Sequence, residues 1–229
     1  MANETMVKKG RPNRQSKKVL VIDDMQNDFC TGVLGNDMTK AVVAKVVKKL
    51  KTKYANYDAI YLTRDIHFDN YPETLEGKKL PIPHCLDDSE GKNIVPELWE
   101  AVQEVRSKGR YVRVINKHTF ASKKLVDYIA ATCGAADEVE LCGVCTDICV
   151  VSNAITLRAE LPNTVIKVDA LCCACTSMKA HNAALRTMNS CQIDIIGRKY
   201  GKNESDDTAE SEGETVSTTA ETTTTEVVE

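Results

Sequence analysis

Three side chains that could carry out nucleophilic chemistry each follow an apolar run typical of a buried strand. Asp24 follows the first such run in the chain, Lys117 the third and Cys149 the fourth. Because the carboxyl ends of parallel strands meet at the same edge of a sheet, we expect the three side chains to converge. A carboxylate can accept a thiol proton, and an ammonium group can stabilise a thiolate, so this set could form an activated nucleophile.

The sequence around Cys149 also favours a reactive thiol. Thr146 and Asp147 are good helix caps, which would place Cys149 in the first turn of a helix. A helix N-terminus and a nearby lysine both lower the pKa of a thiol. The alternative is a buried structural cysteine beside an unrelated aspartate and lysine, because ten cysteines supply many accidental placements. Residue types and spacing leave both interpretations open.

A second group of residues is typical of a divalent metal site. Asp65 and His67 are separated by one residue, so on an extended backbone they project to the same side. His84 follows in the same loop, and one carboxylate with two imidazoles suits zinc, with manganese or iron as alternatives. Glu76 is the candidate fourth ligand and Glu73 its alternative. A loop with ordinary polar residues is the competing interpretation.

The alternation of strand-like and helix-like segments predicts the scaffold that must position these residues. Short apolar runs typical of strands lie at 18–23, 59–63, 111–115, 138–142, 164–168 and 192–196. Helical spacing occurs at 39–52, 95–105, 122–132, 147–160 and 178–188. Such alternation predicts βαβ units, so we expect a three-layer α/β/α fold with a six-stranded, mostly parallel sheet. The long loop at 64–93 is typical of a functional segment.

The composition predicts one folded domain between two charged ends. Residues 1–18 hold six Lys or Arg and one acid, whereas residues 202–229 hold nine acids and one Lys. We expect 1–17 to be a basic flexible arm and 200–229 an acidic, disordered tail rich in Thr and Glu. Residues 18–199 would form the folded domain, whose nearly balanced charge argues against a nucleic-acid-binding face.

The apolar segments exclude two other classes of protein. No run approaches the roughly 20 residues of a membrane helix, and the first residues lack the apolar stretch of a secretory signal peptide. We therefore expect a cytoplasmic protein with no membrane partner, whose cysteines stay reduced. Two CxxC pairs, at 142/145 and 172/175, lie within apolar stretches, which argues against a zinc ribbon.

Several separated motifs resemble the isochorismatase-like cysteine hydrolases. They follow one another in the family's order, at 21–30, 63–67, 81–85, 117–122 and 143–150. The resemblance covers residues 18–197 and implies the family's Rossmann-like α/β/α fold. It also favours a catalytic set over an accidental one. It implies that Asp24 accepts and later donates a proton, that Lys117 is its electrostatic partner and that Cys149 is the nucleophile.

The resemblance implies further features of the site. A cis peptide between Val144 and Cys145 would turn the Cys145 amide toward the site, where it would form an oxyanion hole with the amide of the nucleophilic cysteine. Gln26 and Phe29 would line the substrate pocket. Asp23 stands where the family has an apolar residue, and strand alternation predicts that its side chain points away from the site.

Within the family, the metal residues together with the cysteine are most similar to the nicotinamidase-like subgroup. The metal would hold the pyridine nitrogen, the thiolate would attack the carboxamide, and water would hydrolyse the resulting thioester. True isochorismatases lack the nucleophilic cysteine, so Cys149 argues against their reaction. The alternatives are an amidohydrolase for another small amide and a non-catalytic binding relative. Family relatives commonly form dimers or tetramers, so we expect a homo-oligomer. Pro81-Ile82-Pro83 replaces the family's usual aromatic wall.

Overall fold

The computed structural model describes residues 17–133 and 136–197 of the 229-residue chain. The predicted acidic tail at 200–229 and all but the last residue of the predicted basic arm at 1–17 lie outside the described residues. The structural account below therefore concerns the segment between them.

Six strands form one sheet in the order β3-β2-β1-β4-β5-β6, and every neighbouring pair is parallel. The strands are β1 Lys18–Asp23, β2 Ala59–Asp65, β3 Tyr111–Lys117, β4 Glu138–Val144, β5 Val165–Ala174 and β6 Asp194–Ile196. The predicted α/β/α fold with a six-stranded sheet is confirmed, and the sheet is parallel throughout rather than mostly parallel.

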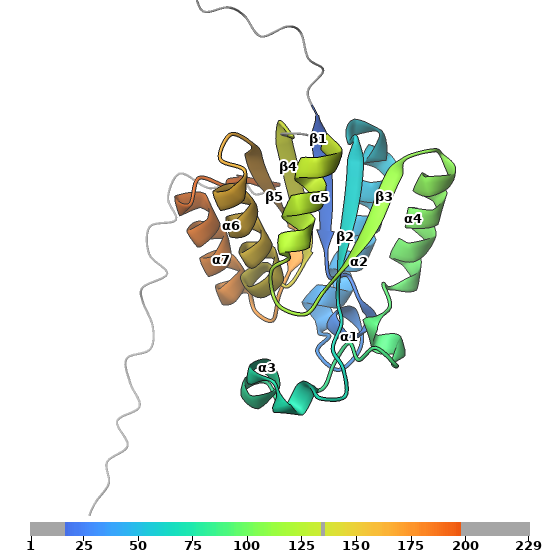
Figure 1. Ribbon diagram of the computed structural model, residues 1–229, viewed down its shortest axis with the longest axis vertical. Helices are drawn as coiled ribbons and strands as arrows, with labels where there is room; N and C mark the ends of the chain where they lie inside the picture. The colour runs from blue at the N-terminus through green and yellow to red at the C-terminus, as the bar shows by residue number, and fades with distance from the viewer. Residues whose placement is uncertain (1–16, 134–135, 198–229) are drawn as a thin grey trace, which may run out of the picture. The chain divides into compact units, whose positions relative to one another are not determined.

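Helices cover both faces of the sheet. In Figure 1, α5 (Lys123–Cys133) and α6 (Val151–Glu160) lie in front of the strands, with α7 (Met178–Ser190) beside α6. Behind the strands lies α2 (Asp37–Lys53), which packs against α4 (Pro96–Ser107). The short helices α1 (Asn27–Cys30) and α3 (Leu75–Lys79) lie near the carboxyl ends of the strands.

The start of α2 illustrates how local sequence fixes an element. The Asn36 side chain accepts hydrogen bonds from the backbone amides of Met38 and Thr39, and the Thr39 hydroxyl accepts one from the Asn36 amide. This capping box satisfies backbone N–H groups that have no partner inside the helix. The helix then buries an apolar stripe against the sheet, comprising Val42, Val43, Val46 and Leu50.

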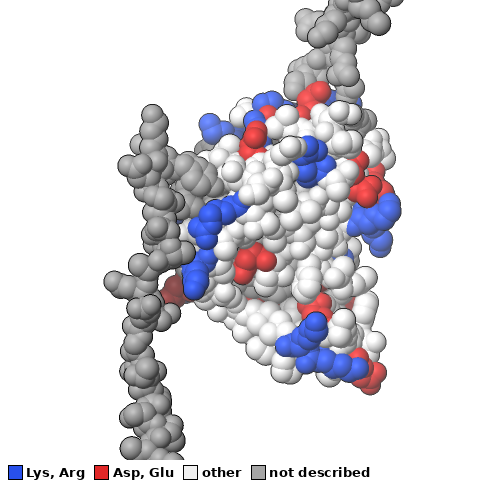
Figure 2. Space-filling model, turned by 90° about the vertical axis from the view of Figure 1, so that its left-hand side faces the viewer, with Lys and Arg blue, Asp and Glu red and all other residues white. Residues whose placement is uncertain are grey.

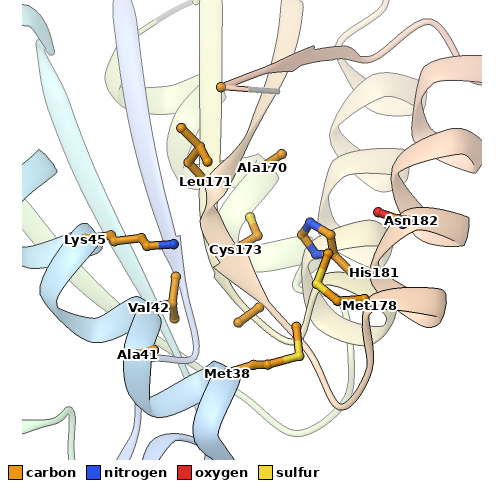
Figure 3. A pocket seen from close by; sticks show the side chains of 12 residues that line it. Met38, Ala41, Val42, Lys45, Ala170, Leu171, Cys173, Met178, His181 and Asn182 are labelled. Carbon is orange, nitrogen blue, oxygen red and sulfur yellow. The ribbon is translucent and has the colours of Figure 1, made fainter. Parts of the chain in front are cut away.

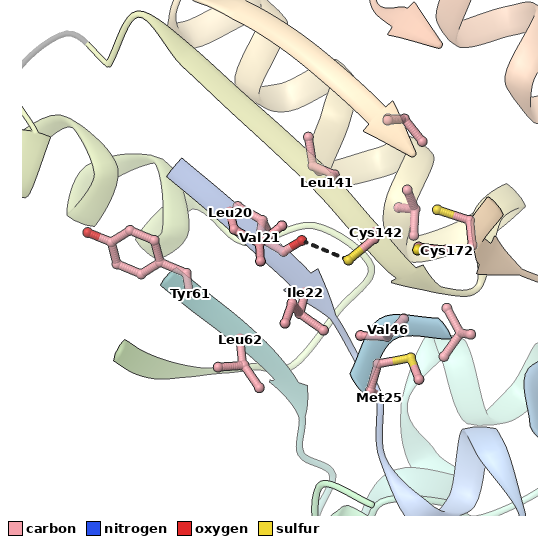
Figure 4. Close-up of a cluster of buried hydrophobic side chains, with 14 of the residues drawn as sticks. Leu20, Val21, Ile22, Met25, Val46, Tyr61, Leu62, Leu141, Cys142 and Cys172 are labelled. Atoms are coloured by element: carbon pink, nitrogen blue, oxygen red, sulfur yellow. Dashed lines mark hydrogen bonds between the residues drawn. The ribbon is translucent and has the colours of Figure 1, made fainter. Parts of the chain in front are cut away.

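The hydrophobic core lies on both faces of the central strands. Val19 to Ile22 on β1 are almost wholly buried, as expected for a parallel strand covered by helices on both sides. Figure 4 shows β1 beside Tyr61 and Leu62 of β2 and Leu141 and Cys142 of β4. The Cys142 thiol contacts the Val21 carbonyl at 3.7 Å, so it behaves as a small core side chain.

The long loop at 64–93 contains more local structure than its composition predicts. It includes the 3₁₀ turns η2 (Tyr71–Glu73) and η3 (Glu90–Lys92), with α3 between them. The Thr74 side chain caps α3 by accepting a hydrogen bond from the Gly77 amide at 2.9 Å. The His67 amide donates to the Cys85 carbonyl at 3.0 Å, which joins the start of the loop to the segment that follows α3.

The strand order creates a crevice for a site. From β1 the chain extends toward β2 and β3 on one side, and β4, β5 and β6 lie on the other. Sites in such sheets form beyond the carboxyl ends of the strands where the order reverses, here at β1 and β4. The residues after β1, β2, β3 and β4 therefore share one edge.

In the part of the chain that the structure describes, no helix is long and apolar enough to cross a bilayer. On the face formed by α6 and α7, Figure 2 shows charged side chains of both signs standing apart on a largely uncharged surface.

We predict that Leu141→Ala lowers the free energy of unfolding by about 2–5 kcal/mol, because it leaves a cavity beside fully buried neighbours. Leu171→Ala is the matched control, since Leu171 is 57% exposed and should change stability by no more than about 0.5 kcal/mol. Urea denaturation followed by circular dichroism measures both. Equal losses for the two variants would contradict this description of the core.

Candidate active site

The structure brings Asp24, Lys117 and Cys149 into contact. Lys117 Nζ lies 2.7 Å from Asp24 Oδ2 and 3.7 Å from Cys149 Sγ. The same ammonium group donates a hydrogen bond to the Thr119 carbonyl at 3.0 Å. All three residues are buried, with exposed fractions of 0%, 4% and 7% for Asp24, Lys117 and Cys149. A carboxylate, an ammonium group and a thiol therefore share one water-poor site.

Each of these side chains is held by a different element. Asp24 directly follows β1 with φ of 45°, a left-handed conformation that is uncommon for residues other than glycine. Its amide donates to the Thr63 hydroxyl at 3.1 Å, which fixes this turn to β2. Lys117 is the last residue of β3. Cys149 lies in η4, a π-helical turn at Thr146–Val150 that leads into α6.

The start of the Cys149 helix differs from the prediction. Cys145 is the N-cap, and no side chain caps the turn. The Thr146 hydroxyl pairs instead with His181 Nδ1 at 2.9 Å, so the predicted capping by Thr146 and Asp147 is wrong. The turn is closed by the amides of Ile148 and Val150, both of which donate to the Cys145 carbonyl.

The charges around Cys149 describe its resting state. Burial raises the pKa of the Cys149 thiol well above its usual value, the negative charge of Asp24 raises it further, and Lys117 only partly opposes them. The expectation of a lowered thiol pKa is therefore wrong for the resting site. For Lys117, burial lowers the pKa, but Asp24 and Cys149 raise it more, so the side chain stays a cation. The thiol thus begins protonated beside a carboxylate that can take its proton.

Asp65, His67, Glu76 and His84 form a second group, directly beside the first. His67 Nε2 lies 2.9 Å from Asp65 Oδ2 and 3.7 Å from Glu76 Oε1, and His84 Nε2 lies 3.8 Å from each of those oxygens. Their four ligand atoms all lie within 4.8 Å of one another. Of the two predicted fourth ligands, α3 brings Glu76 into this group, and Glu73 is not part of it.

The group fits a divalent metal ion on its own chemistry. Two imidazole nitrogens and two carboxylates are ligands that zinc accepts. His84 Nδ1 pairs with the Ile82 carbonyl at 2.8 Å, which directs Nε2 toward the group. Asp65 Oδ1 is buried without a hydrogen-bond partner among the described residues, although Lys117 Nζ lies 3.8 Å away. For Asp65, burial raises the pKa, but the hydrogen bond from His67 and the charge of Lys117 lower it more.

Two predicted pocket residues contact the group formed by Asp65, His67, Glu76 and His84, called the metal group below. Gln26 accepts a hydrogen bond from the Asp65 amide at 2.6 Å and donates to the carbonyls of Asp65 and Lys92. Its polar atoms therefore fix the backbone of Asp65, and its predicted contact with substrate stays a prediction. The Phe29 ring lies 5.4 Å from the ring of His84.

The loop between β4 and η4 contains the cis peptide that the family resemblance implies. The peptide between Val144 and Cys145 is cis. Gly143 has φ of 123°, and a Cβ atom there would lie 2.1 Å from the Asp23 carbonyl oxygen, so only glycine fits. The oxyanion-hole role of the Cys145 and Cys149 amides stays a prediction.

Sequence reasoning missed Thr63 and Asn153 and placed Asp23 incorrectly. Thr63 Oγ1 lies 3.0 Å from Asp23 Oδ1 and 2.7 Å from Asp24 Oδ1, so both carboxylates point to the same hydroxyl. The prediction that Asp23 points away from the site is wrong, because the left-handed conformation of Asp24 ends the strand alternation. Asn153 follows Cys149 by one helical turn, a spacing that could have drawn attention to it.

Two cavities are candidates for the substrate site. One, of about 740 Å³, opens above the metal group, and its lining includes His67, Glu76, His118 and Phe120. The other, of about 380 Å³, lies between α2, β5 and α7 and is lined by none of the predicted site residues (Figure 3). The first cavity is therefore the candidate substrate entrance.

Comparisons with known proteins identify the family of the chain. The isochorismatase domain family matches residues 18–199. The chain belongs to the isochorismatase domain family. It is 26% identical over 186 residues to the nicotinamidase/pyrazinamidase of Mycobacterium tuberculosis, covering 78% of this chain and 98% of that protein. The pyrazinamidase/nicotinamidase structure from Streptococcus mutans is similar, with a TM-score of 0.69 and 26% identity over 79% of this chain and 100% of that one.

A third relative shares the fold of this isochorismatase domain. The structure of the Pyrococcus horikoshii pyrazinamidase in complex with zinc has a TM-score of 0.63 and 21% identity, covering 79% of this chain and 98% of that one. The predicted membership in the isochorismatase-like family, within its nicotinamidase-like subgroup, is confirmed.

We predict that His84→Ala lowers the amount of zinc retained by this isochorismatase-family protein after gel filtration, because one of four candidate ligands is lost. His118→Ala is the control, since His118 is exposed and pairs with the Ile66 carbonyl instead of a carboxylate. Inductively coupled plasma mass spectrometry measures metal per chain. Similar zinc content in the two variants would show that His84 is not a ligand.

Proposed function

We propose that the protein is a metal-dependent nicotinamidase that converts nicotinamide and water to nicotinate and ammonia through a thioester on Cys149. The coarser statement rests on the family and its relatives: the chain is an isochorismatase-family hydrolase that acts on amide C–N bonds. One observation carries the finer proposal. The Asp24, Lys117 and Cys149 contact lies beside a four-residue group suited to a metal, so a nucleophile and an anchor adjoin one another.

The first half of the reaction uses the resting charges of the site. Asp24 takes the thiol proton as Cys149 sulfur attacks the carboxamide carbon, and Lys117 stabilises the negative charge of the pair. The amides of Cys145 and Cys149 donate to the carbonyl oxygen as it becomes an oxyanion, with the cis peptide after Val144 turning the Cys145 amide inward. Asp24 then passes its proton to the amide nitrogen, the C–N bond breaks and ammonia leaves.

The second half releases the product. A water molecule attacks the thioester carbon while Asp24 accepts its proton, and the C–S bond then breaks. Asp24 returns its proton to sulfur, and the acid product releases the second proton of the water to solvent, so nicotinate leaves and the site regains its starting charge. Asp24 serves as base and acid in turn, and Lys117 stays within 2.7 Å of it as its electrostatic partner.

Asp65, His67, Glu76 and His84 would hold the metal, for which we propose zinc, with manganese or iron as alternatives. When bound, it supplies an acceptor site for the lone pair of the pyridine nitrogen. Gln26 positions this group through the Asp65 backbone, and Phe29 provides an apolar wall next to His84. The thiol and the oxyanion donors perform the chemistry, so the metal group positions the ring.

We predict that Cys149→Ala reduces nicotinamide hydrolysis by at least about 10³-fold while the circular dichroism spectrum and melting temperature are retained. Cys191→Ala is the matched control, because Cys191 is an exposed thiol outside the site. Ammonia release measures turnover of both variants. If the folded Cys149→Ala variant keeps most of the activity, the nucleophile lies elsewhere.

A second prediction separates nicotinamide from other amides. Benzamide lacks the ring nitrogen, so its kcat/KM should be about 10²-fold below that of nicotinamide, a loss typical of a misplaced substrate. His67→Ala should lower kcat/KM on nicotinamide by a similar factor. Alkylation of Cys149 by iodoacetamide, followed by mass spectrometry of its peptide, should change much less, since Asp24 and Lys117 are untouched. Equal turnover of the two amides by the unmodified enzyme would indicate another substrate.

A further inference from the structure

Asp23 is a buried carboxyl group beside the catalytic aspartate. Asp23 and Asp24 are both completely buried. Lys117 Nζ lies 2.7 Å from Asp24, whereas the hydrogen-bonding contacts of the Asp23 side chain are with the uncharged side chains of Thr63 and Asn153. Asp23 Oδ2 has no hydrogen-bond partner among the described residues. A buried carboxylate in this setting is costly, but a buried carboxylic acid is much less so.

The three contacts of the Thr63 hydroxyl can all be hydrogen bonds only if one of the two carboxyl groups carries a proton. Thr63 Oγ1 accepts a hydrogen bond from the Asp24 amide at 3.1 Å and lies 2.7 Å from Asp24 Oδ1 and 3.0 Å from Asp23 Oδ1. A hydroxyl group has one proton and two lone pairs. It can donate to only one carboxyl oxygen, so the other contact is a hydrogen bond only if that oxygen carries a proton.

Asn153 fixes the orientation of Asp23. The amide of Ser122 donates to Asn153 Oδ1 at 2.8 Å, so Asn153 must direct its Nδ2 group toward Asp23 Oδ1, at 2.9 Å. Asn153 is itself 1% exposed, so its amide has little freedom to turn. Ser122 follows the loop that begins at Lys117, which links Asp23 to the segment carrying the catalytic lysine.

We propose that Asp23 is a positioning residue, an uncharged carboxylic acid that donates to Thr63, which in turn donates to Asp24 and so holds Asp24 as the ionised partner of Cys149. This inference rests on the proposed function, because it assigns the proton acceptor of that reaction. The proton belongs on Asp23 because Lys117 stabilises a negative charge on Asp24, which it contacts directly. With the proton on Asp23, each of the three contacts of the Thr63 hydroxyl is a hydrogen bond.

The surrounding charges agree with this assignment. Burial and the negative charge of Asp24 raise the pKa of Asp23 to about 8, against the opposing effect of Lys117. The titratable groups that face Asp23 are Asp24, which directly follows β1, Lys117 on β3 and the Cys173 thiol on β5. The adjacent β4 presents Gly143, and Thr63 on β2 and Asn153 on α6 do not titrate.

Ionisation of Asp23 would impair the site in two ways. The pKa is raised, so the group is neutral below about pH 8 and becomes an anion above it. The anion competes with Asp24 for the single Thr63 proton. It also adds a second negative charge beside the place where the thiolate and the oxyanion form, which raises the free energy of both. An Asp23→Asn variant cannot undergo this change.

The first test observes the proton directly. Infrared difference spectra of the full-length protein at neutral pH, wild type minus Asp23→Asn, should contain a buried carboxylic-acid C=O band that converts to a carboxylate band above about pH 8. Glu140→Gln is the matched control, because Glu140 is a buried carboxylate that is paired with Lys49 and should contribute no such band. Absence of the acid band from the wild-type difference spectrum would overturn the proposal.

The second test measures the effect on the site. The pH midpoint for iodoacetamide alkylation of Cys149 should fall by about one unit or more in Asp23→Asn, and it should stay in place in Glu140→Gln. From pH 7 to pH 9, kcat/KM on nicotinamide should fall by up to about tenfold in the wild type and by less than about twofold in Asp23→Asn. Superimposable alkylation midpoints and pH profiles, in variants with normal circular dichroism spectra, would show a purely structural role.

The two proposals fail in different ways. If nicotinamide is not hydrolysed but the alkylation midpoint shifts in Asp23→Asn, the substrate is wrong and the role of Asp23 stands. If nicotinamide is hydrolysed and the midpoint does not move, the role of Asp23 is wrong and the proposed function stands.

Discussion

The ion pair between Lys117 and Asp24 is the interaction on which the rest of the site depends. Both charges are withdrawn from water, and removing an ion from water costs several kcal/mol unless a partner compensates. Each group compensates the other at 2.7 Å, and the Thr119 carbonyl and the Thr63 hydroxyl complete their hydrogen bonding. Such pairs contribute little to net stability, which favours the proposal that this one serves the chemistry at Cys149.

The parallel sheet makes this pairing possible. Asp24, Asp65 and Lys117 follow or end β1, β2 and β3, and Cys149 follows β4, yet these strands are far apart in the chain. They are neighbours in the order β3-β2-β1-β4, so their carboxyl ends bring two carboxyl groups, one ammonium group and one thiol to the same edge. Strands buried on both faces are rigid supports, which suits a site that tolerates little displacement.

The sequence predicted the parts of the structure that depend on periodicity. The apolar runs at 18–23 and 111–115 were predicted as strands, and the structure has strands there. The first run is buried from Val19 to Asp23, as expected for a strand covered on both faces, whereas the second lies on the edge strand β3 and buries only Ile115. The spacing of Asp65 and His67 was enough to predict that their side chains lie on the same side of the backbone. Features that depend on a single backbone angle or on a long loop were beyond prediction. The left-handed conformation of Asp24 ended the strand alternation, so the side chains of Asp23 and Asp24 both point to the Thr63 hydroxyl. The Thr74 side chain caps α3, the helix that brings Glu76 rather than Glu73 to the candidate metal ligands.

Three acidic groups of the site have different roles because their surroundings differ. Asp24 contacts a lysine and is a carboxylate, Asp65 faces two imidazoles and is a candidate metal ligand, and Asp23 contacts only uncharged partners. Environments that separate neighbouring titratable groups in this way assign acid and base roles in many enzymes. The high resting pKa of the Cys149 thiol comes first from its burial and then from the negative charge of Asp24, which Lys117 only partly opposes. The proposed reaction forms a thiolate and then an oxyanion, and every nearby carboxyl group that stays neutral lowers the free energy of both. That is the physical reason for the proton that we propose on Asp23.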